Sequence, residues 1–429
     1  MVTKDLLKQL IVTFQDSLPI ELKPRETIIP TDTEKIITLP GVRRCGKSSI
    51  ILLTINRLIT QGVSKERILY LNFDDDRLLF EPGESDKILE AYRERFPHYP
   101  MNTVYIFFDE IQELEGWSKF VRRVYDQEST HLFITGSNAK LLSSEMSTSL
   151  RGRTLQYEIF PLSFREYCSF REIPTDFYHV TNKATVFNAF EAYLTDGGFP
   201  EIALRKRELK LNILQDYYFS MLYKDLCERY QIRNVEGVKY FNLRMLINAS
   251  NPTSVNKIVN EIKSHDKKFS KDFGYELANQ TENIYLFLPL TKYDQSYVKE
   301  VQSAKKYYCI DNGFFQALLP STDMNHGILL ENALYLHLRR QTTPVSDLHF
   351  LAGSSNCDFV WVENRTIVQA IQSAWDISDP KTYKREIEAF KNIDCEDCLL
   401  ITSEEERDVT EFGKNIRIRP AWKYFLSHE

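Results

Sequence analysis

A glycine-containing stretch, TLPGVRRCGKSS at residues 38–49, has the residue types that bind phosphate. Gly41, Gly46, Lys47 and Ser48 fit the pattern G-x-x-x-x-G-K-S/T. An apolar run, KIIT, precedes the stretch, and a helical pattern, SSIILLTINRLI, follows it. Glycines let backbone N–H groups approach phosphate oxygens, and the N-terminus of the following helix adds partial positive charge. The stretch therefore predicts a phosphate-binding loop in which Lys47 meets the β- and γ-phosphates and Ser48 holds Mg²⁺.

The rest of the loop is assigned to the same nucleotide site. The charges of Arg43 and Arg44 favour anion binding. The full set of predicted nucleotide-contacting residues is Gly41, Arg43, Arg44, Cys45, Gly46, Lys47, Ser48 and Ser49.

An acidic pair ends the apolar run TVYIFFDE, at Asp109 and Glu110. A carboxylate at the tip of a neighbouring strand can reach the coordination shell of Mg²⁺, so Asp109 is predicted, with Ser48, to hold the metal. Glu110 is predicted to orient and deprotonate the attacking water. An acidic pair at the end of a strand is also ordinary turn chemistry; its position behind a phosphate-binding loop favours the catalytic interpretation.

Two further polar segments, one after HLFITG and one at SLRGRT, complete the predicted catalytic set. Ser137 and Asn138 follow the apolar run HLFITG and are predicted to sense the γ-phosphate, although both are also favoured helix caps. The stretch SLRGRT supplies Arg151 and Arg153. A guanidinium near the transferred phosphate accelerates its transfer, and Arg153 is predicted to act so within the chain or on a neighbouring subunit. The alternative is a pair of surface arginines at a glycine turn.

The elements that must position these residues are visible as alternating patterns. Between residues 35 and 172, five β-rich runs alternate with helix-like stretches, which predicts a parallel sheet with helices on both faces. Residues 1–34 contain an amphipathic helix, and residues 173–235 read as helices broken by the turn DGGFP. Residues 236–300 read as three short helices followed by β-rich segments, and residues 301–429 as a further α/β region.

These motifs together resemble the AAA-type ATPases of bacteria and archaea that carry a C-terminal domain of unknown function. The resemblance rests on GVRRCGKSS, YLNFDDDRLL, YIFFDEIQELEGWSKFVRRVYD, FITGSNAKLLSSE, LRGRT, FPLSFREYCSF, GGFPE, KYYCIDNGFFQALL and GILLENALYLHLRR. It implies ATP and Mg²⁺ as ligands, the roles given above, and a sheet with the strand before the loop in its centre. Cys45 departs mildly from the small or aliphatic residue of related loops.

The resemblance also implies a fold for each region. The expected architecture is a P-loop NTPase core (35–172), a helical lid (173–235), a winged helix-turn-helix (236–300) and a degenerate restriction-endonuclease-like α/β domain (301–429). In the winged helix, SKDFGYELANQTENI would be the recognition helix. The expected partner is DNA or a protein, because basic and acidic residues both occur there: Lys263, Lys267, Lys268 and Lys271 against Asp272, Glu276 and Glu282.

The last region departs from a working nuclease of the type it resembles. Such an enzyme needs an acid on one strand and an acid-x-lysine on the next. Glu331 and Asp358 are in place, but Gln372 and Ala374 stand where glutamate and lysine are wanted. The expectation is a domain that does not cleave, with an active metal-dependent nuclease as the disfavoured alternative.

Composition limits the remaining choices. The 429 residues carry a net charge of −6, which excludes a basic signature over the whole chain. No run of eighteen apolar residues occurs, the N-terminus does not resemble a signal peptide, and seven scattered cysteines fit a reducing cytoplasm. We expect a cytoplasmic Mg²⁺-dependent ATPase that couples the nucleotide to movement of its C-terminal half. The alternative is a nucleotide-gated switch with little turnover.

Overall fold

The computed structural model describes residues 2–137, 150, 152–176, 180–264, 269–319, 325–353 and 356–427. The chain divides into two compact units, unit 1 (Met1–Phe160) and unit 2 (Pro161–Glu429). No helix of the described ranges is long and apolar enough to cross a membrane. Four residues with roles assigned above lie outside those ranges: Asn138, Arg151, Lys267 and Lys268.

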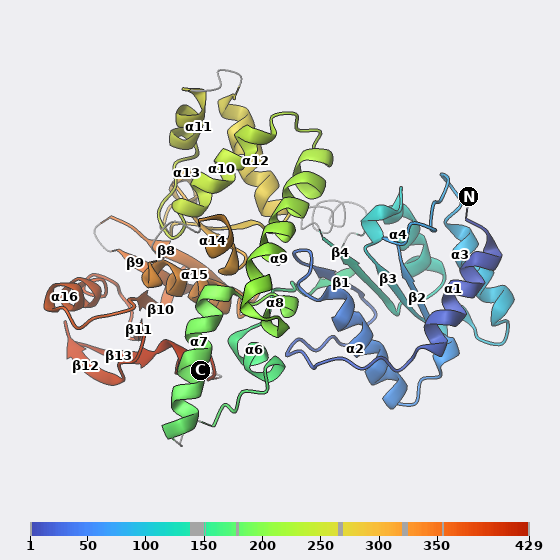
Figure 1. Ribbon diagram of the computed structural model, residues 1–429, viewed down its shortest axis with the longest axis horizontal. Helices are drawn as coiled ribbons and strands as arrows, with labels where there is room; N and C mark the ends of the chain where they lie inside the picture. Colours follow the sequence, from blue (N-terminus) through green and yellow to red (C-terminus); the bar gives the residue numbers. More distant parts are fainter. Residues whose placement is uncertain are drawn as a thin grey trace. The chain divides into compact units, whose positions relative to one another are not determined.

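Unit 1 is built on a five-stranded parallel sheet in the order β2-β3-β4-β1-β5 (Figure 1). Its strands are β1 (Ile36–Pro40), β2 (Ile68–Asn72), β3 (Tyr105–Asp109), β4 (Leu132–Gly136) and β5 (Thr154–Gln156). They coincide with the five β-rich runs, so the predicted parallel sheet is confirmed. The loop-bearing strand β1 is interior, between β4 and β5, but the middle strand is β4, which corrects the expectation of a central β1.

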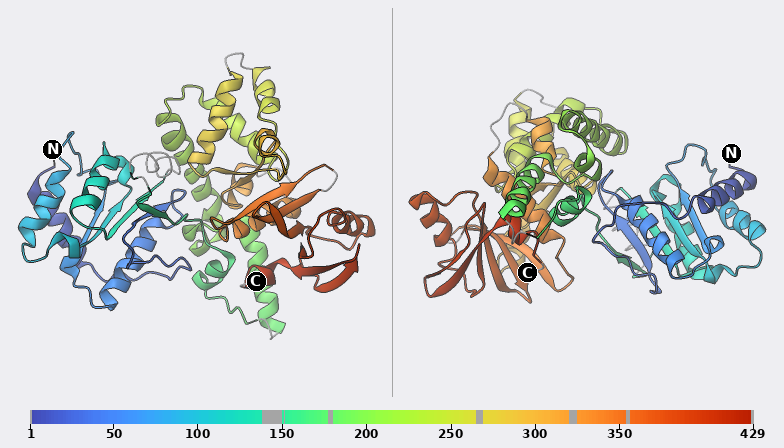
Figure 2. Two further views of the ribbon diagram at one scale, coloured as in Figure 1. Left: turned by 180° about the vertical axis from the view of Figure 1, so that it is seen from behind. Right: turned by 60° about the horizontal axis from the view of Figure 1, so that its bottom comes forward.

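Helices cover both faces of this sheet, as predicted (Figure 2). They are α1 (Lys4–Asp16), α2 (Lys47–Thr60), α3 (Asp86–Arg95) and α4 (Trp117–Gln127), with 3-10 turns at Lys65–Arg67, Met101–Thr103 and Ile111–Glu113. The connection β1-α2-β2 runs across the sheet opposite to β2-α3-β3 and β3-α4-β4. Right-handed crossovers therefore place α2 on one face and α3 and α4 on the other. Helix α1 joins the core of α3 and α4 through Leu7 and Ile11, so the N-terminal segment belongs to unit 1.

The first part of unit 2 is helical. It contains α6 (Phe164–Phe170), α7 (Val180–Asp196), α8 (Pro200–Leu204), α9 (Arg207–Ser220) and a π-helix at Met221–Glu228. Ser163 and Glu166 form a capping box that starts α6. This helix was expected in the ATPase core, but it packs against α7 and α8 in unit 2, and the division between the units falls after Phe160.

Three helices and a two-stranded sheet follow. The helices are α10 (Val235–Ile247), α11 (Val255–Lys263) and α12 (Lys271–Asn283), and the antiparallel strands are β6 (Phe287–Leu290) and β7 (Lys306–Cys309), with α13 (Tyr297–Gln302) between them. This is the order expected of a winged helix, an identification that stays a prediction. The expected boundary between residues 300 and 301 falls between the two paired strands.

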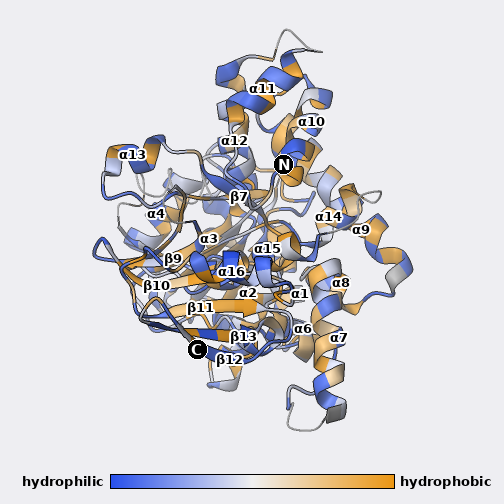
Figure 3. Cartoon of the chain, turned by 90° about the vertical axis from the view of Figure 1, so that its left-hand side faces the viewer, coloured by the Kyte–Doolittle hydropathy of each residue, from blue (hydrophilic) through white to orange (hydrophobic). Residues whose placement is uncertain are grey.

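The last part is a mixed six-stranded sheet in the order β12-β13-β11-β10-β9-β8. Its strands are β8 (Ser346–Leu351), β9 (Cys357–Glu363), β10 (Thr366–Ser373), β11 (Cys398–Thr402), β12 (Arg407–Glu411) and β13 (Lys414–Pro420). The helices of this region are α14 (Gly313–Leu318), α15 (His326–Arg339), α16 (Pro380–Glu388) and α17 (Ala421–Tyr424). Interior strand β11 is hydrophobic along its length and fully buried (Figure 3), as expected for a strand covered on both faces. The nuclease-like identity of this sheet stays a prediction.

Candidate active site

The loop between β1 and α2 reaches the helix through two left-handed residues. Arg44 has φ +66°, and Gly46, which caps α2, has φ +99°. Glycine adopts this conformation without the steric cost that other residues meet. Since glycine has no side chain to cap the helix, the N–H groups of the first turn are left for another acceptor. An anion at this point would accept those N–H groups and meet the positive end of the helix dipole.

Lys47, the first residue of α2, is buried and turns back toward the loop. Its Nζ donates to the carbonyl oxygens of Gly41 and Val42, both at 3.2 Å, and lies 3.3 Å from Oε1 of Glu110. Burial lowers the pKa of Lys47, but the neighbouring acidic groups, Glu110 first, outweigh it and the net pKa is raised. The ammonium therefore stays charged where phosphate would lie.

Asp109 ends β3 and is fully buried, with hydroxyl donors on both neighbouring strands. Oδ1 accepts from Thr135 on β4, and Oδ2 accepts from the Tyr70 hydroxyl on β2 at 3.0 Å. The Ser48 hydroxyl also acts to lower the pKa of this carboxyl. Burial raises the pKa of Asp109, and the hydroxyl donors act against that rise.

Glu110 follows β3 in the left-handed region, with φ +51°. A non-glycine residue in this conformation costs about 1–3 kcal/mol and is held by its surroundings. Its N–H donates to Thr135 Oγ1 at 2.9 Å, and its Oε2 accepts from Gln112 Nε2 at 2.6 Å. Burial raises the pKa of Glu110, but Lys47, Gln112 and Arg43 outweigh it, so the pKa is lowered and the carboxylate is ionised at neutral pH.

Ser137 lies at the same edge of the sheet, directly after β4, and is buried. Gln112 Nε2 lies 3.5 Å from its Oγ, so Gln112 connects Ser137 with Glu110. The residues predicted from three separate segments thus meet at the carboxyl edge of the sheet: Lys47, Ser48, Asp109, Glu110 and Ser137.

These residues fit a nucleotide with Mg²⁺. Asp109 and the Ser48 hydroxyl supply hard oxygen donors, the kind that Mg²⁺ takes alongside water and phosphate oxygens. The left-handed loop, the start of α2 and the charged Lys47 form the anion-binding half. A bound Mg²⁺ would neutralise charge on the transferred phosphate.

The loop is braced from outside by residues that sequence reasoning did not single out. Arg25 Nη1 donates to the carbonyl oxygen of Cys45 at 2.8 Å, and its Nη2 donates to that of Phe160 at 3.0 Å. Gly41 bridges Ile159 so closely that a Cβ at Gly41 would lie 2.2 Å from the Ile159 carbonyl oxygen. Glycine is therefore required at position 41 for packing.

The other predicted residues are distributed differently. Arg43 is half-buried, and its charge lowers the pKa of Glu110. Arg44 is exposed, and Ser49 is half-buried. Cys45 is buried, and burial raises the pKa of its thiol. Arg153 is not brought to the loop. Its carbonyl oxygen accepts from the N–H of Ile36 at the other end of β1, and its Nε lies 3.0 Å from Asp126 Oδ1.

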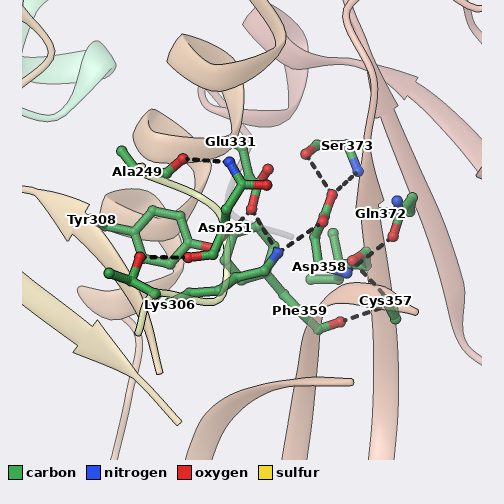
Figure 4. Close-up of polar contacts among 12 residues, drawn as sticks. Ala249, Asn251, Lys306, Tyr308, Glu331, Cys357, Asp358, Phe359, Gln372 and Ser373 are labelled. Atoms are coloured by element: carbon green, nitrogen blue, oxygen red, sulfur yellow. Dashed lines mark hydrogen bonds and ion pairs between the residues drawn. The ribbon is translucent and has the colours of Figure 1, made fainter. Parts of the chain in front are cut away.

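A second group of predicted residues meets in unit 2 (Figure 4). Glu331 on α15 and Asp358 on β9 are joined by Lys306 of β7, whose Nζ lies 2.9 and 3.1 Å from their oxygens. Gln372 hydrogen-bonds the N–H of Asp358, and Ala374 is buried. The cation that position 374 does not supply is therefore supplied by Lys306, which sequence reasoning missed. Across the described ranges, no three or more His, Cys, Asp or Glu side chains are grouped to hold a metal ion.

Some missed residues had a weak signal in the sequence. Tyr70 and Thr135 are polar positions inside apolar runs, on the two strands that flank β3. Gln112 lies two residues after Glu110. Arg25 and Lys306 act across long sequence separations, where a single sequence carries no local signal.

Comparisons with known proteins match family models to two parts of the chain and find relatives of it. Residues 33–168 match the family model described as "AAA domain", and residues 187–325 match a "Domain of unknown function (DUF8612)". The "Uncharacterized protein MJ1544" of Methanocaldococcus jannaschii is 33% identical over 450 residues, covering 100% of this chain and 97% of that protein. An "Uncharacterized protein" of Haemophilus influenzae is 30% identical over 310 residues, covering 72% of this chain and 76% of its own length.

The solved structure titled "S. cerevisiae Hsp104-ADP complex" matches with a TM-score of 0.29 and 13% identity. The match covers 60% of this chain, which spans about half (48%) of that one. This likeness is too low to carry an argument about fold or function.

Proposed function

The chain belongs to the family that includes MJ1544 of Methanocaldococcus jannaschii, and we propose that it binds ATP with Mg²⁺ and hydrolyses it. It has an AAA domain and a domain of unknown function. The observation that carries the proposal is the meeting of Lys47, Asp109 and Glu110 at the edge of one sheet. Lys47 and Glu110 are both charged, and Asp109 offers its carboxyl oxygens at the end of the same strand that Glu110 follows.

The chemistry follows from these residues. The N-terminus of α2 and Lys47 hold the β- and γ-phosphates, and Ser48 with Asp109 holds Mg²⁺. Glu110 is ionised, so it accepts a hydrogen bond from the attacking water and takes its proton. Gln112 donates to that carboxylate and orients it, and Ser137 lies beside Gln112.

We further propose that nucleotide state moves unit 2, which acts on DNA or on a protein partner. The exposed residues of α12 are mixed in charge rather than basic: Lys271, Asp272, Tyr275, Glu276 and Asn279. A mixed surface gives DNA no advantage over a protein.

The second candidate is a nucleotide-gated switch with little turnover. Arg153, the predicted accelerating arginine, pairs with Asp126 at the far end of β1. Rapid hydrolysis would then need an arginine from a partner or a second subunit, and turnover by the isolated chain would be slow.

The test is phosphate release from ATP with Mg²⁺, together with nucleotide binding, for three variants. Lys47→Ala should lose tight ATP binding, because it removes the buried cation of the loop. Glu110→Gln should bind ATP and hydrolyse it at least about 100-fold more slowly, a typical size for loss of a positioned base. Glu115→Gln, an exposed control three residues beyond Gln112, should behave as the native chain.

Native turnover by Glu110→Gln would disprove the role given to that carboxylate. Adding duplex or single-stranded DNA distinguishes the two candidates. Stimulation that depends on Lys47 favours an ATPase coupled to nucleic acid, and an unstimulated slow rate favours the switch.

A further inference from the structure

Lys306, Glu331 and Asp358 form a charged cluster in unit 2, which we call the Lys306 centre (Figure 4). They come from β7, α15 and β9, segments that are distant in sequence. Lys306 is buried, with 9% of its side-chain surface exposed, and Glu331 and Asp358 are mostly buried, with 14% and 15% exposed. The ammonium lies directly between the two carboxylates, and both contacts have ion-pair distances.

Other protein donors complete the shell of both carboxylates. Glu331 Oε1 also accepts from the Tyr308 hydroxyl at 2.8 Å. Asp358 Oδ2 accepts from the hydroxyl and the N–H of Ser373, at 2.9 and 3.2 Å. The acids are thus held by the protein's own cation and hydrogen-bond donors.

Gln372 makes its hydrogen bonds outside the ion pairs of the Lys306 centre. Its carbonyl oxygen accepts from the N–H of Asp358 at 3.0 Å, and its amide donates to Glu386 at 2.7 Å. Both ends of the side chain are therefore engaged, and the oxygen that could ligate a metal is bound to backbone. An amide is in any case a weaker Mg²⁺ ligand than a carboxylate.

The electrostatics require a cation between the acids. Glu331 Oε1 and Asp358 Oδ1 lie 2.9 and 3.1 Å from one ammonium, so the two largely buried carboxylates face each other across it. Two buried carboxylates side by side do not both stay ionised without a compensating positive charge. Removing the ammonium would leave either a shared proton or a need for another cation.

A cavity of about 980 Å³ gives access to the centre. Glu331, Asp358, Gln372 and Ser373 line it, together with Trp375 and His326. Ions in solvent can therefore reach the two carboxylates, so metal binding depends on the chemistry of the centre and not on access.

We infer that the Lys306 ammonium takes the position between Glu331 and Asp358 that a divalent cation would otherwise occupy, so that unit 2 contains a latent metal site kept metal-free by its own lysine. This inference is independent of the proposed ATPase. It makes the cavity a binding site that does not use metal chemistry, and it explains how the acids are tolerated without the lysine expected at position 374.

The test is Mn²⁺ titration of the full chain without nucleotide, with free Mn²⁺ followed by electron paramagnetic resonance. The native chain should bind no more Mn²⁺ than Asp358→Asn, a comparison that cancels any metal held by unit 1. Lys306→Met, similar in length and uncharged, should gain one Mn²⁺ per chain with at least tenfold higher affinity. The double variant Lys306→Met/Asp358→Asn should lose that gain.

Two results would overturn the inference. One is Mn²⁺ binding by the native chain that Asp358→Asn abolishes, or plasmid nicking with the same dependence, since either means that metal displaces the lysine. The other is a folded Lys306→Met that gains no Mn²⁺. If Lys306→Met is unfolded without metal, a rise in its melting temperature on adding Mn²⁺ supports the inference, and no rise overturns it.

Discussion

At the residue scale, one hydroxyl determines how both acids of the candidate active site are held. Thr135 donates to Asp109 and accepts from the N–H of Glu110. It therefore anchors the metal-binding carboxylate and the left-handed backbone of the water-activating one together. Because its hydroxyl is engaged by these two acids, Thr135 acts through them as a positioning residue.

Replacing Thr135 by valine should slow ATP turnover while leaving nucleotide affinity within a few-fold. Valine keeps the shape of threonine but breaks both hydrogen bonds. A hydrogen bond to a charged group contributes about 1.5–3 kcal/mol, so turnover should fall roughly 10- to 100-fold. Steady-state phosphate release and binding of a fluorescent ATP analogue separate the two effects.

Thr38→Val provides the matched control. Thr38 is buried on the adjacent strand β1, and its hydroxyl faces the carbonyl oxygen of Leu155 at 3.4 Å. This variant should keep nearly native turnover. Equal losses in both variants would mean that the sheet, and not the acids, is affected.

At the element scale, the helices and strands of unit 1 could be predicted closely from the sequence. KSSIILLTINRLIT and WSKFVRRVYDQ occupy α2 and α4 over their whole lengths, because their apolar residues recur at helical spacing. LQDYYFSMLYKDLCERY reads as one helix, yet α-helical hydrogen bonding ends at Ser220 and a π-helix follows. The spacing of apolar residues does not distinguish an α-helix from a π-helix, because over a single turn both place the same side chains on similar faces.

The parts of the sites that depend on long-range contacts could not be predicted. Lys47, Ser48 and Asp109 lie in motifs that local pattern identifies. Lys306 reaches Asp358 across 52 residues, and Arg25 reaches Phe160 across 135. Such pairs depend on how distant elements pack together. A single sequence shows local patterns of residues and does not show which distant residues come into contact.

The turn DGGFP, residues 196–200, contacts Asp311, a buried carboxyl group whose pKa is raised. Asp311 accepts from the N–H of Gly198 at 2.7 Å and from the N–H of Gly313 at 2.9 Å. Gly197 has φ +84°, and a Cβ there would lie 1.7 Å from Asp311 Oδ1, so the turn tolerates only glycine. Burial raises the pKa of Asp311 to about 7, although the two N–H donors and Arg340 lower it.

Asp311 should make unit 2 less stable as pH rises. Its pKa is higher in the folded chain than the ordinary value of 3.8, so its favourable contribution is complete below about pH 4 and is lost through pH 7. At about 1.4 kcal/mol per pKa unit, the free energy of unfolding should fall by a few kcal/mol between pH 5 and pH 8.

Urea unfolding of the native chain and of Asp311→Asn measures this effect. Three of the four tryptophans, Trp361, Trp375 and Trp422, lie in unit 2, so fluorescence reports mainly on that unit. The asparagine variant should be less stable at pH 5 and should lose this part of the pH dependence. The same slope in both proteins would contradict the assignment.

At the scale of the whole molecule, the covalent junction between the units begins beside the phosphate-binding loop. Ile159 bridges Gly41, and Arg25 joins the carbonyl oxygen of Cys45 to that of Phe160, the last residue of unit 1. In unit 2, the Pro161 carbonyl oxygen accepts from Arg340 at 2.9 Å, and the N–H of Leu162 donates to Gly198 at 2.6 Å. Each unit thus hydrogen-bonds its own end of the Phe160–Pro161 junction.

Because of this short junction, ATP should change hydrogen exchange in unit 2 near Leu162 and Gly198, and Arg25 should be needed for the change. The experiment uses Glu110→Gln, which is expected to hold ATP, at saturating nucleotide, with peptide-resolved exchange measured by mass spectrometry. Adding Arg25→Gln should remove the response in residues 161–200 while exchange in the loop itself still responds to ATP. Adding Lys35→Gln instead removes a bond to the carbonyl oxygen of Gly152 at the opposite edge of the sheet, and the response should persist. An unchanged response with Arg25→Gln would mean that any signal between the units travels by another route, and that Arg25 only braces the loop.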